Sequence, residues 1–174
     1  MCIRDSYLTI DSRIQAIVDF ELEQGLSKYG AASGAAIVVD PWTGEIYALA
    51  EKDGARAGKI STGSGLYSTG CIYEPGSTFK LITAAYLLER GEVDPYDVFY
   101  GEEGKAEFWF GTFNDDHKFG WLTFKEAFKK SSNICTIKAV MDTDRDAFYS
   151  FLLRFGFGSR TGIDLPAESA GTLR

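Results

Sequence analysis

The sequence holds few of the residues from which metal and redox sites are built. It has one histidine, His117, and three cysteines, Cys2, Cys71 and Cys135, with no C-x-x-C pair. We therefore expect no zinc site, no disulfide framework and no histidine-based triad. Long apolar runs are also missing, because stretches such as AASGAAIVV and LITAAYLL are far shorter than the ~18 residues that span a bilayer. We expect no membrane segment within these residues.

Basic charge is scarce as well. The chain carries 18 Lys and Arg against 25 Asp and Glu, a formal net charge of −7. Binding of nucleic-acid phosphates requires clustered basic side chains, so nucleic acid is not an expected partner. The hydrophobic share of 45% over 174 residues suffices for the core of one ordinary domain or of part of a larger one.

The two ends indicate a fragment. Residues 1–6, MCIRDS, lack the apolar stretch of a signal peptide and are predicted to be a foreign or disordered start. The chain stops at GTLR, after a stretch punctuated by Gly and Pro, with no closing element. We expect residues 7–174 to form one partial domain.

Local patterns predict the first elements. Apolar residues at helical spacing predict a helix from about Asp11 to Lys28, with Asp11 as N-cap and Gly30 as its stop. The runs AAIVVD and EIYALA around the turn PWTG predict a β-hairpin. Residues 51–70 are rich in Gly and Ser and are predicted to be a loop.

The later elements are predicted to be mostly helical. The segment YEPGSTFKLITAAYLLERG is apolar nearly all round and predicts a helix buried in the middle of the domain and ended by Gly91. Residues 94–120 are expected to be irregular. Thr123 and Glu126 predict a capping box, and a last helix is expected to be capped by Asp144 and ended by Gly156.

Ser77 and Lys80 lie three residues apart at the start of the predicted buried helix. That spacing places both side chains on one face, one turn apart. A serine hydroxyl is a weak nucleophile and needs a base, and a lysine can be that base if burial lowers its pKa. The start of a helix also offers free backbone N–H groups to a developing oxyanion. Taken alone, S-x-x-K is more often a helix cap than a catalytic pair.

The triplet Ser131-Ser132-Asn133 is a polar break between two helical segments. Such a break can present a hydroxyl and an amide to a cleft. Taken alone, it is better explained as a helix boundary, because Ser and Asn favour caps and turns.

Together the two motifs indicate a family. S-x-x-K and S-x-N are two of the three signature elements of penicillin-binding proteins and related β-lactamases. The segments YLTIDSRIQ, GAAIVVDPWTGEIYALA, YEPGSTFK, LTFKEAFKKSSN and FGFGSRTGIDLPAES resemble the transpeptidase domain of class B penicillin-binding proteins, the division and elongation type. The resemblance runs from about Tyr7 to Arg174.

The resemblance implies a role for four residues. Ser77 would attack the D-Ala-D-Ala carbonyl of a peptidoglycan stem peptide, and Lys80 would accept its proton. Ser131 would pass a proton to the departing amine, and Asn133 would bind the substrate amide and help to position Lys80. A second stem peptide would then resolve the acyl-enzyme, while β-lactams would leave Ser77 acylated. This chemistry implies neither a metal ion nor an organic cofactor.

The chain departs from the family pattern in two places. The third motif, K-[ST]-G, has no match, and Arg160-Thr161-Gly162 is read as a structural turn that precedes the missing strand. The loop over 51–68 is short and lacks the usual Asn-Arg pair before the active serine. We expect the fragment to be impaired or inactive by itself.

The resemblance also implies the fold. We expect an α+β protein, an α/β/α sandwich of the D,D-peptidase/β-lactamase-like type, with an antiparallel sheet, flanking helices and missing C-terminal strands. The Ser77 helix would lie between that sheet and a mostly helical lobe over 91–156.

Three functions stay open at this point. The first is a peptidoglycan D,D-transpeptidase that is anchored in the bacterial cytoplasmic membrane outside this segment, has its catalytic domain on the outer side, and works beside a membrane-bound glycosyltransferase. The second is a serine β-lactamase or D,D-carboxypeptidase. The third is a non-enzymatic penicillin-recognising sensor or a degenerate homologue.

Several other residues are expected to be structural. Asp115, Asp116 and His117 are read as a polar loop, and Cys71 and Cys135 as packing residues. The residue pattern leaves open whether four aromatic residues cover the core or line a substrate groove: Phe108, Trp109, Phe110 and Trp121.

Overall fold

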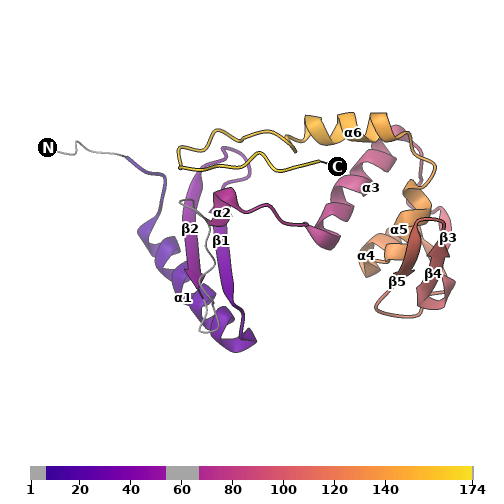
Figure 1. Ribbon diagram of the computed structural model, residues 1–174, viewed down its shortest axis with the longest axis horizontal. Coiled ribbons are helices and arrows are strands. Elements are labelled where there is room, and N and C mark those ends of the chain that lie inside the picture. The colour runs from indigo at the N-terminus through magenta and orange to yellow at the C-terminus, as the bar shows by residue number, and fades with distance from the viewer. Residues whose placement is uncertain (1–6, 54–66, 174) are drawn as a thin grey trace, which may run out of the picture. The chain divides into compact units, whose positions relative to one another are not determined.

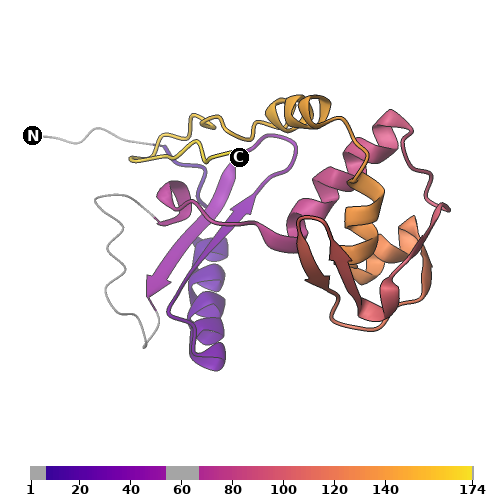
Figure 2. The same cartoon turned by 45° about the vertical axis from the view of Figure 1, so that its right-hand side comes forward.

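The computed structural model describes residues 7–53 and 67–173. These residues form two compact units (Figures 1 and 2). The first unit comprises the described residues up to Ile72 together with Arg160–Ala170, and the second comprises Tyr73–Ser159 together with the described residues from Gly171. The predicted character of residues 1–6 lies outside the described residues. None of the described helices is long and apolar enough to cross a membrane.

Helix α1, Ser12–Tyr29, is confirmed together with both of its ends. The Asp11 carboxylate accepts hydrogen bonds from the backbone N–H groups of Arg13 and Ile14, and Gly30 takes the left-handed conformation, with φ of 59°, that ends the helix. The Gln15 amide joins α1 to the hairpin, because its Nε2 donates to the Leu49 carbonyl at 3.1 Å and its Oε1 accepts from the Leu49 N–H at 2.9 Å.

The predicted hairpin is formed by β1, Ser33–Val39, and β2, Ile46–Asp53, in antiparallel register. Strand β2 is longer than expected, since its last residues pair with the first residues of β1. The predicted loop over 51–70 is therefore wrong at both ends, where β2 continues to Asp53 and a short helix α2 spans Tyr67–Gly70. The side-chain pattern does not reveal this extension, because the backbone hydrogen bonds between antiparallel strands form whatever side chains the strands carry. Residues 54–66 lie outside the described residues.

The second unit packs around α3, Lys80–Arg90, which follows a 3-10 turn at Gly76–Phe79. Its core contains Tyr86, whose ring meets those of Phe148 and Phe151 edge to face at centroid distances of 5.1 and 5.2 Å. The prediction that this helix is buried on all sides is wrong among the described residues. Leu87 is fully buried, whereas Leu81 is 60% exposed.

Three further helices complete this unit: α4 (Phe124–Lys130), α5 (Asn133–Val140) and α6 (Arg145–Arg154). The capping box of α4 is confirmed, because Thr123 and Glu126 exchange side-chain and backbone hydrogen bonds. Asp144 caps α6, as the sequence predicts.

The stretch expected to be irregular, 94–120, contains three short strands, and a fourth follows directly after it, so that two antiparallel pairs form. Strand β3, Val98–Tyr100, pairs with β6, Trp121–Thr123, and β4, Lys105–Phe108, pairs with β5, Gly111–Asn114. The mostly helical lobe predicted for 91–156 is thus a mixed one. Strands of three or four residues are too short to show an alternating pattern, and partners distant in the sequence stabilise them.

Candidate functional site

The S-x-x-K pair lies on the 3-10 turn and at the first residue of α3. Gly76 opens the turn with φ of 60°, and the Lys80 N–H donates to the Ser77 carbonyl. In a 3-10 turn the side chains at i and i+3 eclipse one another, whereas in an α-helix they are offset. Among the described residues, the Lys80 amine makes no hydrogen bond to the Ser77 hydroxyl, and the two residues are joined through the backbone of this turn. Ser77 is exposed and Lys80 is half-buried.

The predicted polar break is confirmed between α4 and α5. Ser131 ends α4 in the left-handed conformation, with φ of 56°, and Ser132 caps α5 by accepting a hydrogen bond from the Cys135 N–H at 3.1 Å. Two helix ends thus meet within three residues. Asn133 is the first residue of α5, directly after the cap.

The Lys80 amine joins the two motifs across 51 positions of sequence. Its Nζ donates to the Ser131 carbonyl at 2.5 Å, to Ser131 Oγ at 3.0 Å and to Asn133 Oδ1 at 2.7 Å. An ammonium group has three N–H donors and no acceptor, so each proton of Lys80 has a partner. Lys80, Ser131 and Asn133, predicted as site residues, are brought into one cluster, and Ser77 lies on the adjoining turn.

Burial lowers the pKa of Lys80 below its ordinary value, because a half-buried ammonium loses part of its hydration. The charges of Asp115 and Asp116 act in the opposite direction and raise it. The lysine is thus displaced toward its neutral form, which a general base requires.

Asn133 is held at both ends of its side-chain amide. Its Oδ1 accepts from Lys80, and its Nδ2 donates to the Asn114 carbonyl at 2.8 Å. These two partners fix which amide atom faces the lysine. Among the residues that the structure describes, the second hydrogen of Nδ2 has no acceptor, so it can donate to a carbonyl oxygen of a ligand.

Asp115 lies in the polar loop that the sequence predicts, but its contacts with the start of α5 are not predicted. Its carboxylate accepts hydrogen bonds from Ser132 Oγ at 2.6 Å and from the N–H groups of Asn133 and Ile134 at 2.5 and 3.3 Å. These partners are 17 to 19 positions away in the sequence, so no local spacing signals them.

The remaining candidates have structural surroundings. Cys135 is fully buried, and burial raises the pKa of its thiol, which confirms its reading as a packing residue. His117 is exposed. Thr161 and Gly162 donate backbone N–H groups to the Glu168 carboxylate, but the structure assigns no turn to Arg160-Thr161-Gly162, so the turn predicted there is not found. In the described ranges no group of three His, Cys, Asp or Glu side chains is placed to hold a metal ion.

None of the four undecided aromatic residues belongs to a core cluster of the described residues. Phe108 and Phe110 stack on each other with ring centroids 5.5 Å apart, and Phe110 is 45% exposed. Trp109 and Trp121 are 91% and 71% exposed and are available to a ligand.

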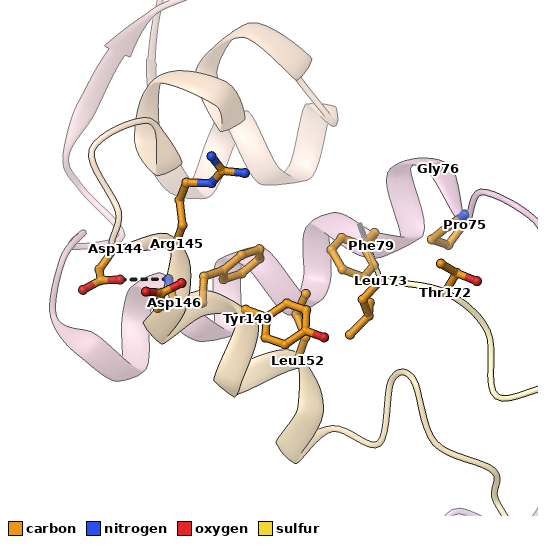
Figure 3. Close-up of a pocket in the computed structure, with 11 residues that line it drawn as sticks. Pro75, Gly76, Phe79, Asp144, Arg145, Asp146, Tyr149, Leu152, Thr172 and Leu173 are labelled. Carbon is orange, nitrogen blue, oxygen red and sulfur yellow. Dashed lines mark hydrogen bonds between the residues drawn. The ribbon is translucent and has the colours of Figure 1, made fainter.

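A cavity of about 800 Å³ lies within the second unit beside the start of α3 (Figure 3). Residues of the 3-10 turn, of α6 and of the last described segment line it: Pro75, Gly76, Phe79, Asp144, Arg145, Asp146, Phe148, Tyr149, Leu152, Thr172 and Leu173. None of the four predicted site residues is in its wall.

Comparisons with known sequences agree with the two motifs. The family model described as "Penicillin binding protein transpeptidase domain" matches residues 34–174. Penicillin-binding protein PbpB of Mycobacterium tuberculosis is 32% identical over 173 residues, which are 94% of this chain and 25% of that protein. Peptidoglycan D,D-transpeptidase FtsI of Escherichia coli is 30% identical, with 94% of this chain and 28% of that protein covered. The chain thus spans about a quarter of the length of these relatives.

Comparisons with solved structures give the same result. The apo structure of the TP domain of penicillin-binding protein 3 from Burkholderia pseudomallei matches 100% of this chain and 49% of that chain, with a TM-score of 0.83 and 28% identity. A peptidoglycan synthetase from Bifidobacterium adolescentis matches 96% of this chain and 31% of that chain, with a TM-score of 0.81 and 30% identity. The predicted α+β fold is confirmed.

Proposed function

The chain belongs to the penicillin-binding protein transpeptidase family, and from that premise we propose that it carries the acylating residues of a peptidoglycan D,D-transpeptidase. One observation supports this proposal most directly. The Lys80 amine contacts Ser131 and Asn133. In the backbone, Lys80 directly follows the 3-10 turn that contains Ser77. We take residues 7–174 to be part of one transpeptidase domain.

The first step of the proposed reaction needs a neutral Lys80. Loss of one ammonium proton frees a lone pair on Nζ, and burial favours this form. Ser77 Oγ then attacks the carbonyl carbon between the two D-Ala residues of a stem peptide while its proton moves to Lys80 Nζ. The product is a tetrahedral intermediate whose oxyanion would be stabilised by backbone N–H groups at the start of the 3-10 turn.

The second step expels the terminal D-Ala. The carbon–nitrogen bond breaks as Ser131 Oγ gives its proton to the departing nitrogen and recovers one from Lys80, with which it is already in contact at 3.0 Å. Ser77 remains as an ester of the stem peptide. The amino group of a second stem peptide then attacks this ester and loses a proton to Lys80 through Ser131. Lys80 returns this proton to Ser77 Oγ as the ester bond breaks, which completes the cross-link and restores the enzyme.

Asn133 has a double role in this proposal. Its Oδ1 keeps the Lys80 amine beside Ser131, and its free Nδ2 hydrogen binds a carbonyl oxygen of the substrate. The proposed reaction needs no metal ion or organic cofactor.

The setting of this activity follows from its substrate. Peptidoglycan lies outside the cytoplasmic membrane, so we place the catalytic domain there, anchored through a segment outside these residues. A membrane-bound glycosyltransferase that makes the glycan strands is the partner we propose. The 25% to 28% of the relatives' length that this chain covers leaves room for such segments.

The test is intact-mass measurement of the complete gene product after incubation with a penicillin. We expect a persistent adduct of one drug molecule that is absent from Ser77→Ala and present in the control Ser27→Ala, whose serine is exposed on α1. Drug consumption without an adduct would indicate the β-lactamase or carboxypeptidase alternative. A folded protein with neither result would leave the sensor or degenerate homologue.

A further inference from the structure

Asp115 lies in the link between β5 and β6 and is half-buried. Its Oδ2 accepts from Ser132 Oγ at 2.6 Å, while its Oδ1 accepts from the N–H groups of Asn133 and Ile134. All three donors belong to the start of α5. The carboxylate of a distant segment therefore completes the N-terminus of this helix.

The start of a helix has four backbone N–H groups without partners inside the helix. At α5 the Ser132 hydroxyl satisfies the N–H of Cys135, and Asp115 satisfies those of Asn133 and Ile134. A negative charge at this end also interacts favourably with the helix dipole. Charge-assisted hydrogen bonds of this kind are stronger than neutral ones, so the position of Asn133 is tightly defined.

The same two residues hold Asn133 by its backbone and by its side chain. Asp115 binds its N–H, and the Asn114 carbonyl binds its Nδ2 at 2.8 Å. The remaining amide oxygen then faces Lys80 at 2.7 Å. We propose that Asp115 is a positioning residue for acylation, which fixes Asn133 and through it the Lys80 amine. This inference rests on the function proposed above.

Asp115 also acts on Lys80 through its charge, and the two effects must be separated. Among the described residues, the charged groups that act on Lys80 are Asp115 and Asp116, both in the β5–β6 link. The groups that contact its amine from the ends of α4 and α5, Ser131 and Asn133, are neutral. Asp116 is exposed, and its carboxylate makes no hydrogen bond to α5 in the described part of the chain, so it provides the matched charge control.

Two substitutions at Asp115 give opposite results under the two explanations. Asp115→Asn keeps an oxygen for the N–H groups of Asn133 and Ile134. Its amide can donate to the Ser132 hydroxyl, whose buried proton then loses its acceptor, so this variant is expected to be less stable while it keeps Asn133 in place. Asp115→Glu keeps the charge but moves the carboxylate by one methylene. If the position of the Asp115 carboxylate determines the maximal acylation rate, Asp115→Asn preserves that rate better than Asp115→Glu does. If only the negative charge at Asp115 matters, Asp115→Glu preserves the rate better.

The experiment measures penicillin acylation of the complete gene product over a range of drug concentrations, which separates binding from the maximal rate. We expect Asp115→Ala and Asp115→Glu to lower the maximal rate roughly 10- to 100-fold, as the loss of charge-assisted hydrogen bonds implies. We expect Asp115→Asn and Asp116→Asn to keep it within about threefold, and to move the acidic limb of the pH profile to lower pH. If Asp115→Ala does not fold, the maximal acylation rates of Asp115→Asn and Asp115→Glu decide between the two explanations.

A second readout does not depend on activity. Hydrogen exchange of the Asn133 and Ile134 amides is expected to quicken in Asp115→Ala and Asp115→Glu and to stay unchanged in Asp116→Asn. A wild-type protein that is not acylated would refute the proposed function, and the exchange rates would still decide whether Asp115 holds this helix start. Wild-type acylation in Asp115→Glu, or unchanged exchange in that variant, would overturn the inference.

Discussion

The two adjacent serines in the break between α4 and α5, Ser131 and Ser132, are expected to differ in what their substitution lowers, which is activity for one and stability for the other. Ser132 is fully buried, donates to Asp115 at 2.6 Å and accepts from the Cys135 N–H at 3.1 Å. Ser131 is exposed, and its hydroxyl contacts the Lys80 amine. We predict that Ser132→Ala mainly lowers stability and that Ser131→Ala mainly lowers activity.

The magnitudes follow from the contacts that each substitution removes. Loss of the Ser132 N-cap costs about 1 kcal/mol, and the half-buried Asp115 oxygen that loses its donor adds roughly 1–3 kcal/mol. The free energy of unfolding should therefore fall by about 2–4 kcal/mol in Ser132→Ala. Ser131→Ala removes one exposed hydrogen bond and should change it by less than about 1 kcal/mol.

The assay compares the urea unfolding midpoints and the penicillin acylation rates of the two variants in the complete gene product. Ser131→Ala is expected to keep the wild-type midpoint and to be acylated more slowly than Ser132→Ala at a temperature where both are folded. The reasoning would be refuted if the two variants lost equal stability, or if Ser131→Ala were acylated at the wild-type rate.

Three further predictions follow from the same contacts. Because burial lowers the pKa of Lys80, acylation should reach half its maximum at a pH below the ordinary lysine pKa, and a pH–rate profile that follows an unshifted lysine would contradict this assignment. Thr123→Ala breaks the capping box of α4 and should cost about 1 kcal/mol of stability with no change in the acylation rate, which denaturation and acylation assays can measure side by side. Cys135 should react with a thiol reagent only on unfolding, because it is buried and its pKa is raised; labelling as fast as that of half-exposed Cys71 would disprove this.

The elements that the sequence predicts well are those whose signals are local. Asp11 and Gly30 mark the two ends of α1, and the capping box marks the start of α4. Each signal acts within a few positions of the element that it bounds. The break after α4 is of the same kind, since a left-handed Ser131 and a capping Ser132 satisfy neighbouring backbone groups.

The elements that sequence reasoning missed depend on distant partners. Strands β3 and β6 have three residues each and are separated by twenty, so neither shows a pattern by itself. The contact of Asp115 with α5 has the same origin. The meeting of Lys80 with Ser131 spans 51 positions and was expected only from the family resemblance, because no spacing rule predicts it.

Ser131 has a backbone conformation that favours glycine, although its serine side chain contacts the proposed base. A left-handed conformation costs a non-glycine residue roughly 1–2 kcal/mol, and glycine is the residue that commonly ends helices in this way. At φ of 56° a glycine would relieve the strain, as it does at the ends of α1 and α3. Serine at this position instead places both its carbonyl and its hydroxyl on the Lys80 amine, at 2.5 and 3.0 Å. A strained residue whose one distinguishing group contacts the proposed base is best explained by the chemistry of that hydroxyl.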